Sequence, residues 1–118
     1  MNIEDLREYC IAKKGVEESM PFGADVLVFK VMRKVFLIAI LENRPLQFNV
    51  KCNPEKAIEL REQYSCVIPG YHMDKKHWNT IIIDDSVNLN LLHEWISDSY
   101  FLVISGLTKK QKKEFASL

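Results

Sequence analysis

The stretch VLVFKVMRKVFLIAILENRPLQFNVK, residues 26–51, decides the fold class of this chain. It contains two apolar runs, Val26 to Met32 and Val35 to Leu41, rich in the β-branched and aromatic residues that favour strands. Arg33 and Lys34 separate the two runs. The pattern predicts a β-hairpin that turns through these residues and carries a basic tip.

A third strand is predicted after the turn residues Glu42 to Pro45. From Leu46 to Lys51 apolar and polar side chains alternate, which is the period of a strand with one face in water. We therefore expect the hairpin to continue into a three-stranded antiparallel meander.

Two helices are predicted on either side of this meander. The first spans Ile3 to Lys14, with Gly15 where a C-terminal cap belongs, and it is followed by the non-helical segment VEESMPFG, residues 16–23. The second spans Pro54 to about Tyr64, because Asn53 suits an N-cap and proline suits the first helical position.

The last third of the chain predicts two more strands and two helices. Cys66 to Ile68 and Asn79 to Asp84 have strand composition, and apolar residues then repeat at helical spacing from Leu89 to Leu107. Thr108 and Gln111 form a capping box for a short final helix. We therefore predict an α+β fold of two layers, in which helices pack on an antiparallel sheet of about five strands. Its order is helix, three strands, helix, two strands, helix and a short last helix.

Length and composition indicate one domain, residues 1–118, with no unusual chemistry. The longest apolar run, Val35 to Leu41, is too short to span a bilayer, and the opening residues lack a secretory or transit pattern. The cysteines Cys10, Cys52 and Cys66 are widely spaced, so we expect reduced thiols, with the first buried and the other two more exposed. The expected location is the cytoplasm.

Charge is unevenly distributed along the chain. The formal net charge is zero, but residues 30–80 hold nine basic and five acidic side chains, a net charge of plus four. Neutral total charge argues against tight DNA binding, while the positive middle of the chain favours contact with an anionic partner.

The segment PGYHMDKKHWNT, residues 69–80, combines basic and aromatic side chains with almost no aliphatic residue. This mixture suits nucleic-acid binding, in which lysines contact phosphates, a histidine adds a donor, and aromatic rings face a base or sugar. The candidate nucleic-acid-binding residues, extended by the meander, are Arg33, Lys34, Lys51, Tyr71, Lys75, Lys76, His77 and Trp78. No helix offers a series of base-reading side chains, so sequence specificity is not predicted.

A second interpretation of the same segment is purely structural. In it, Trp78 begins a strand and fills the core between sheet and helices, Tyr71 packs below the loop, and Lys75 and Lys76 only face solvent. The lysine-rich Lys109 to Lys113 is likewise a solvated face, although lysines in a first helical turn oppose the helix dipole and so suggest contact with an anion.

A catalytic or metal site would use His72 and His77 with Asp74 between them, joined by Cys66 or by Glu17 and Glu18. Their spacing does not suit a shared ligand set, and Lys75 and Lys76 would repel a divalent cation. No Gly-rich phosphate loop, nucleophile elbow or HExxH motif is present. We therefore expect no enzyme activity, no cofactor and no metal.

Three segments resemble the MmcQ/YjbR family of small bacterial proteins: VEESMPFG, KCNPEKAIELREQY and PGYHMDKKHWNTIIIDDS. The resemblance covers nearly the whole chain and implies a two-layer fold similar to type III secretion chaperones and to the CyaY group. Family members are commonly described as DNA-binding from a double-wing structural comparison, so it also implies a DNA-binding role, with the first hairpin and the basic loop as wings. Relatives often place glycine or acidic residues at the hairpin tip, where this chain has Arg33 and Lys34.

A further alternative is a protein-interaction module, because the secretion-chaperone-like fold binds partner chains and often forms dimers. The run from Tyr100 to Ile104 is apolar on all sides of a helix, so Phe101, Leu102 or Ile104 would meet another protein or a second copy. Alternatively, the last helix folds back and covers this surface.

Overall fold

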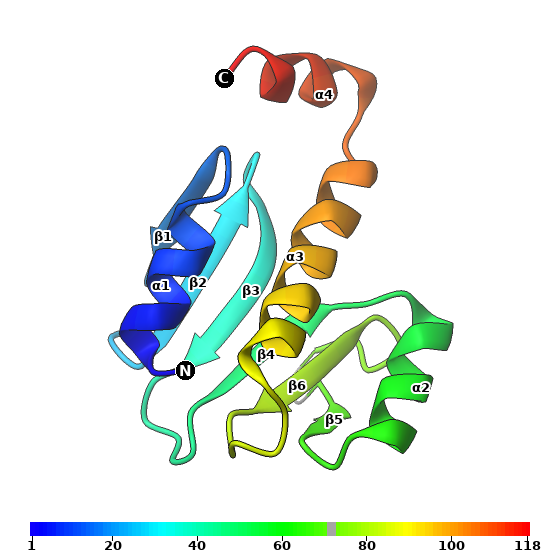
Figure 1. Ribbon diagram of the computed structural model, residues 1–118. Helices are drawn as coiled ribbons and strands as arrows, with labels where there is room; N and C mark the ends of the chain where they lie inside the picture. Colours follow the sequence, from blue (N-terminus) through cyan, green and yellow to red (C-terminus); the bar gives the residue numbers. More distant parts are fainter. Residues whose placement is uncertain (71–72) are drawn as a thin grey trace.

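The computed structural model describes residues 1–70 and 73–118 and confirms the α+β fold. Within them, one six-stranded antiparallel sheet has the order β1-β2-β3-β4-β6-β5, and helices α1, α2 and α3 pack on it (Figure 1). The elements are α1 (Ile3–Ile11), β1 (Val16–Ser19), β2 (Val26–Val31), β3 (Lys34–Ile40), β4 (Gln47–Lys51), α2 (Pro54–Gln63), β5 (Val67–Pro69), β6 (Trp78–Ile82), α3 (Leu89–Ser105) and α4 (Lys109–Ala116).

The predicted meander is confirmed as strands β2, β3 and β4. Met32 and Arg33 form the two-residue hairpin turn and both have positive φ, 50° and 66°. A turn with two positive φ values matches the right-handed twist of the strands that it joins, which makes it the favoured hairpin geometry. Arg33 and Lys34 are exposed at this tip, as predicted.

The segment after α1 is non-helical, as predicted, but it contains a strand that the sequence did not indicate. Val16–Ser19 pairs antiparallel with β2 at the edge of the sheet, which brings the total among the described residues to six where about five were expected. None of its side chains is buried, so the alternation that reveals a half-buried strand is missing from its sequence.

Helix α1 ends at Ile11, so the prediction that it runs to Lys14 is wrong. The amide of Lys13 bonds to the carbonyl of Cys10 (3.2 Å), which tightens the last turn and ends the α-helical pattern. Gly15 follows with φ +73°, a conformation that turns the chain into β1.

The hydrophobic core lies between the helices and one face of the sheet. Its members include Leu6 from α1, Phe29 and Phe48 from the sheet, and Ile96 from α3, all fully buried. Cys10 is buried, as predicted, and Cys52 is half-buried. The expected exposure of Cys66 is wrong, because this residue packs in the core just before β5.

The predicted helices after the meander are confirmed with ends that differ by one or two residues. Thr108 and Gln111 form the predicted capping box of α4. Helix α4 lies beyond the end of α3 (Figure 1). Lys14 Nζ, from the segment after α1, donates to the carbonyl of Ala116 in α4 (3.4 Å). In the described part of the chain, no helix has both the length and the apolar character needed to cross a bilayer.

Candidate nucleic-acid interface

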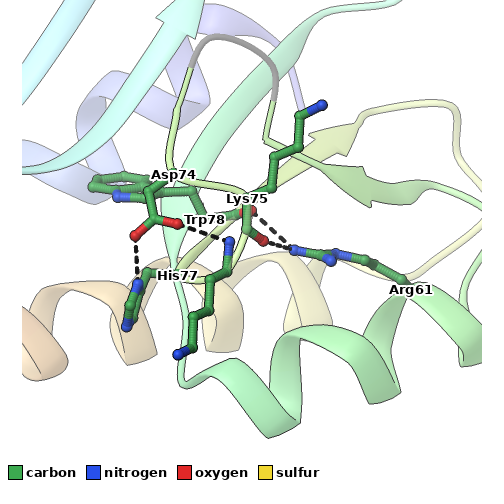
Figure 2. Close-up of polar contacts among 6 residues, drawn as sticks. Arg61, Asp74, Lys75, His77 and Trp78 are labelled. Atoms are coloured by element: carbon green, nitrogen blue, oxygen red, sulfur yellow. Dashed lines mark hydrogen bonds and ion pairs between the residues drawn. The ribbon is translucent and has the colours of Figure 1, made fainter.

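The lysine turn, residues 74–77, is a single helical turn that leads into β6. The carbonyl of Asp74 accepts hydrogen bonds from the amides of His77 (3.1 Å) and Trp78 (3.0 Å). The Asp74 carboxylate folds back over the turn, because Oδ1 accepts from the amide of Lys76 (3.0 Å) and Oδ2 lies 2.5 Å from His77 Nδ1 (Figure 2). The hydrogen bond with His77, followed by that from Lys76, lowers the pKa of Asp74 below its ordinary value.

Arg61 of α2 holds the lysine turn from the helix side (Figure 2). Its Nε donates to Asn79 Oδ1 (2.6 Å), and a terminal nitrogen donates to the carbonyls of Lys75 and Trp78 (3.3 Å for the latter). From the sheet side, the amide of Cys52 donates to the carbonyl of His77 (2.7 Å). The backbone of the turn is therefore fixed by α2, β6 and the end of β4 together.

Lys75 and Lys76 are exposed on this fixed backbone. In the described residues, neither ammonium group has an acidic side chain within ion-pair distance. Two positive charges without an ion-pair partner among the described residues therefore face solvent on a turn whose shape is set by hydrogen bonds, an arrangement suited to a phosphate.

Trp78 begins β6, as the structural interpretation predicted, but it does not fill the core between sheet and helices. Asn79 faces α2, where its side chain bonds to Arg61 and to the carbonyl of Ala57 (3.3 Å). Because successive side chains of a strand alternate between faces, Trp78 and Thr80 lie on the opposite, helix-free face. Trp78 is half-buried and does not belong to the helix-packed core, where Trp95 from α3 is buried instead.

The other predicted basic residues lie at the same end of the sheet. Lys51, the last residue of β4, is half-buried and pairs directly with Trp78. The Arg33 and Lys34 tip also projects from this end, but β4 separates β3 from β6, which spaces those strands by about 10 Å. In Figure 1 the tip is accordingly well apart from the start of β6. In the structure, Lys51 therefore lies next to the lysine turn, and the Arg33-Lys34 tip forms a separate basic patch.

Tyr71 of the predicted nucleic-acid site and His72 of the alternative catalytic site lie outside the described residues. Within residues 1–70 and 73–118, no group of three or more His, Cys, Asp or Glu side chains is placed to hold a metal ion. The paired carboxylate of Asp74 instead caps the lysine turn. Burial raises the pKa of the Cys52 thiol, which favours the protonated and unreactive form.

Arg61 is the site residue that sequence reasoning missed. It follows Ala57 by four positions, so both lie on one face of α2, and Ala57 is buried. A charged residue on the apolar side of a helix needs a polar partner. The position of Arg61 on the same helical face as Ala57 was therefore the sequence signal that could have identified it as a site residue. The identity of the partner depends on the docking of α2 against β6.

The YjbR family model matches residues 11–102 of the chain. This chain belongs to the YjbR family. The match confirms the family resemblance seen in the sequence, and it covers the sheet, α2 and most of α3.

Relatives align over most or all of the chain. The uncharacterised protein YjbR of Escherichia coli (strain K12) is 33% identical over 119 residues, which cover 100% of both chains. The uncharacterised protein YbdF of Escherichia coli O157:H7 is 38% identical over 99 residues, 83% of this chain and 80% of that protein. Neither name states an activity.

Solved structures confirm the fold. The crystal structure of Deinococcus radiodurans protein DR2400, with domain DUF419, matches with a TM-score of 0.91 and 36% identity over 98% of this chain and 88% of that one. A Pseudomonas syringae crystal structure matches with a TM-score of 0.76 over 86% of this chain and 98% of that one. Its identity of 23% supports a shared fold alone. A functional assignment therefore has to start from the surface of this chain.

Proposed function

We propose that this chain binds the phosphate backbone of DNA weakly and largely without sequence preference, through the lysine turn with Lys51 and the Arg33-Lys34 tip. The observation that carries the proposal is the pair of exposed lysines, Lys75 and Lys76, on a turn held by Arg61. The double-wing description of the family is consistent with it, because the hairpin tip and the lysine turn leave the same end of the sheet.

The small number of cations sets the expected affinity. Each phosphate neutralised by Lys or Arg contributes about −0.9 to the slope of log K against log salt concentration. Contacts by the five cations of this surface therefore predict a slope of about −4.5, which is shallower than the slope of a protein that makes about six to ten phosphate contacts. Base reading is not part of the proposal, because the lysine turn offers no series of side chains that reach base edges in the major groove.

Fluorescence anisotropy with a labelled DNA duplex at several salt concentrations tests the proposal. The variant Lys75→Glu/Lys76→Glu should lose binding. The matched control is Lys112→Glu/Lys113→Glu, which makes the same change in net charge at an exposed pair farther along α4. Equal losses in both variants would show that only net charge matters, and absence of binding by the folded protein at low salt would overturn the proposal.

The proposed role is non-enzymatic and requires neither a cofactor nor a metal. In this role the contact between Asp74 and His77 orders the lysine turn, and neither residue acts as an acid or base on a substrate. The cytoplasm, where nucleic acid is accessible, is the proposed location.

A second candidate function is the binding of another protein, including a second copy of the chain. Phe101 supports it, because this residue of α3 is 60% exposed and α4 leaves it uncovered. Leu102 and Ile104 contribute less, since both are half-buried and Ile104 packs against the core. Light scattering after size exclusion distinguishes this candidate: a concentration-dependent dimer that Phe101→Ser abolishes would support it, and a monomer at all concentrations would exclude the homodimer.

A further inference from the structure

Among the described residues, one face of the sheet carries no helix. Helices α1, α2 and α3 all lie on the other face (Figure 1). Val28, Asn49 and Thr80 are nevertheless buried on this helix-free face, and none of the three belongs to the helix-packed core. Strand pairing places them in one row, because Val28 pairs with Ile38, Ile38 with Asn49, and Asn49 with Thr80.

A hollow of about 530 Å³ opens on this face, at the end where β3 turns into β4. This volume lies within the range of small-molecule sites, roughly 300–1,000 Å³. Apolar side chains and amides surround it together, which is the usual composition of such a site. The lining residues are Val26, Ile40, Glu42, Asn43, Gln47, Asn49 and Thr80. A second hollow of similar volume is bounded by residues of α1 and its C-cap Ala12, so one helix surface forms it.

Asn49, a buried residue, supplies an oriented amide donor to this hollow. The residue is 6% exposed, and its Oδ1 accepts a hydrogen bond from the hydroxyl of Thr80. This contact assigns the other end of the amide, Nδ2, as the donor. In the described part of the chain, no protein acceptor bonds to Nδ2. This amide nitrogen reaches solvent in the hollow, so it is available to an acceptor on a bound ligand.

The charges around the hollow define the ligand further. Glu42 is the one charged residue in the lining, so an anionic group is unfavourable inside it. Cations lie farther along the same face: Lys51 is two residues beyond Asn49, and Lys30 is two residues beyond Val28, each a separation of about 7 Å. The face therefore combines an uncharged pocket with flanking positive charges.

We propose that this hollow takes an uncharged base of a single-stranded nucleic acid. Asn49 Nδ2 donates to an acceptor on the base, and Lys51 and Lys30 hold neighbouring phosphates. Trp78 lies beside Lys51 on the same face and offers a ring on which a second base stacks. Bases of a duplex are paired and stacked, so a hollow of this kind favours single strands. This inference rests on the proposed function and specifies the form of nucleic acid.

Three ligands of equal length separate the contributions: labelled oligothymidine, its abasic counterpart with the same phosphates, and a duplex. Anisotropy at one low salt concentration should show that oligothymidine binds more tightly than the other two. Asn49→Ala should weaken oligothymidine binding about three- to tenfold, the effect of one lost hydrogen bond, and leave abasic binding unchanged. Asn90→Ala, at an exposed position of α3, is the matched control and should change neither.

Gln47→Ala provides a second test, at a half-buried residue that lines the hollow. If Asn49→Ala fails to fold, oligothymidine binding by Gln47→Ala tests the inference by itself. Its expected effect is also a loss confined to oligothymidine. Equal affinity for oligothymidine and the abasic strand, or a loss that includes the abasic strand, would overturn the inference while the proposed phosphate binding stands. If the folded protein binds none of the three ligands, both proposals fail.

Discussion

Arg61 of α2 and Asn79 of β6 are joined by a hydrogen bond of 2.6 Å from Nε to Oδ1, and the same guanidinium holds the carbonyls of Lys75 and Trp78. Asn79 is 1% exposed, and its Nδ2 donates to the carbonyl of Ala57. A buried polar network therefore connects α2 to the lysine turn, and the docking of this helix sets where the lysines point.

Arg61→Lys should destabilise the protein and weaken duplex binding, although the net charge is unchanged. A lysine ammonium cannot reproduce the planar fork of the guanidinium, so Asn79 Oδ1 or the turn carbonyls lose their donor. An unsatisfied buried acceptor costs about 1–3 kcal/mol, which urea unfolding would measure. Anisotropy with the DNA duplex would measure the second effect.

The matched control for Arg61→Lys is Arg7→Lys. Arg7 makes an exposed ion pair with Glu18, and such pairs contribute about 0–1 kcal/mol. If Arg61→Lys costs no more than Arg7→Lys, the network around Asn79 does not hold the lysine turn.

Ser99→Ala should be strongly destabilising, because the buried hydroxyl of Ser99 makes hydrogen bonds to the backbones of two strands. Ser99 Oγ donates to the carbonyl of Phe36 (2.6 Å) and accepts from the amide of Lys51 (2.8 Å). The pairing of β2 with β3 shifts between Phe29 and Lys30, which leaves Phe36 without a cross-strand partner. Loss of the hydroxyl should cost about 2 kcal/mol or more, measured by urea unfolding.

Ser105→Ala is the control for this prediction, because Ser105 is exposed and bonds within its own helix. Its cost should stay within about 0.5 kcal/mol. Similar costs for the two alanine variants would mean that Phe36 and Lys51 find other partners when Ser99 is replaced.

The elements that the sequence predicts well are those with local signals. Strands β2, β3 and β4 follow from composition and alternation, and α2 from the Asn53 cap with Pro54. Strand β1 lacks such a signal because Val16–Ser19 buries no side chain and is held by pairing with β2. The end of α1 also depends on tertiary structure, since the chain must turn there to reach this edge.

The lysine turn was predicted because its charged residues are adjacent in sequence. Arg61 and the hollow around Asn49 could not be predicted in the same way. Both depend on which face of the sheet the helices cover, and residues distant in sequence determine that. Lys30 is an example, because its place two strands away from Lys51 follows from the sheet order β2-β3-β4.

The pairing of Asp74 with His77 should make the lysine turn sensitive to acid. The folded-state pKa of Asp74 is lowered, so its contribution to stability is complete above the ordinary carboxyl value and is lost as pH falls through the lowered value, below about pH 4. An NMR titration of the Asp74 carboxyl carbon measures the shift directly. His77→Ala should move this pKa up toward its ordinary value, because the His77 hydrogen bond is the main cause of the shift. A titration that stays unchanged in this variant would contradict the assignment.

Arg33→Gly should increase stability and weaken DNA binding at the same time. Arg33 has φ +66°, a left-handed conformation that costs a residue with a side chain about 1–2 kcal/mol and glycine almost nothing. The matched variant Arg33→Ala removes the same charge but keeps the backbone strain. Urea unfolding should therefore find the glycine variant more stable than the alanine variant by about 1 kcal/mol, while anisotropy finds the same reduced DNA affinity for both.

Equal stability of the two variants would show that the turn relaxes without strain, and unchanged DNA affinity would remove the hairpin tip from the proposed interface. Because backbone strain persists where the surrounding structure maintains it, opposite effects on stability and binding would indicate that the arginine is retained for its charge.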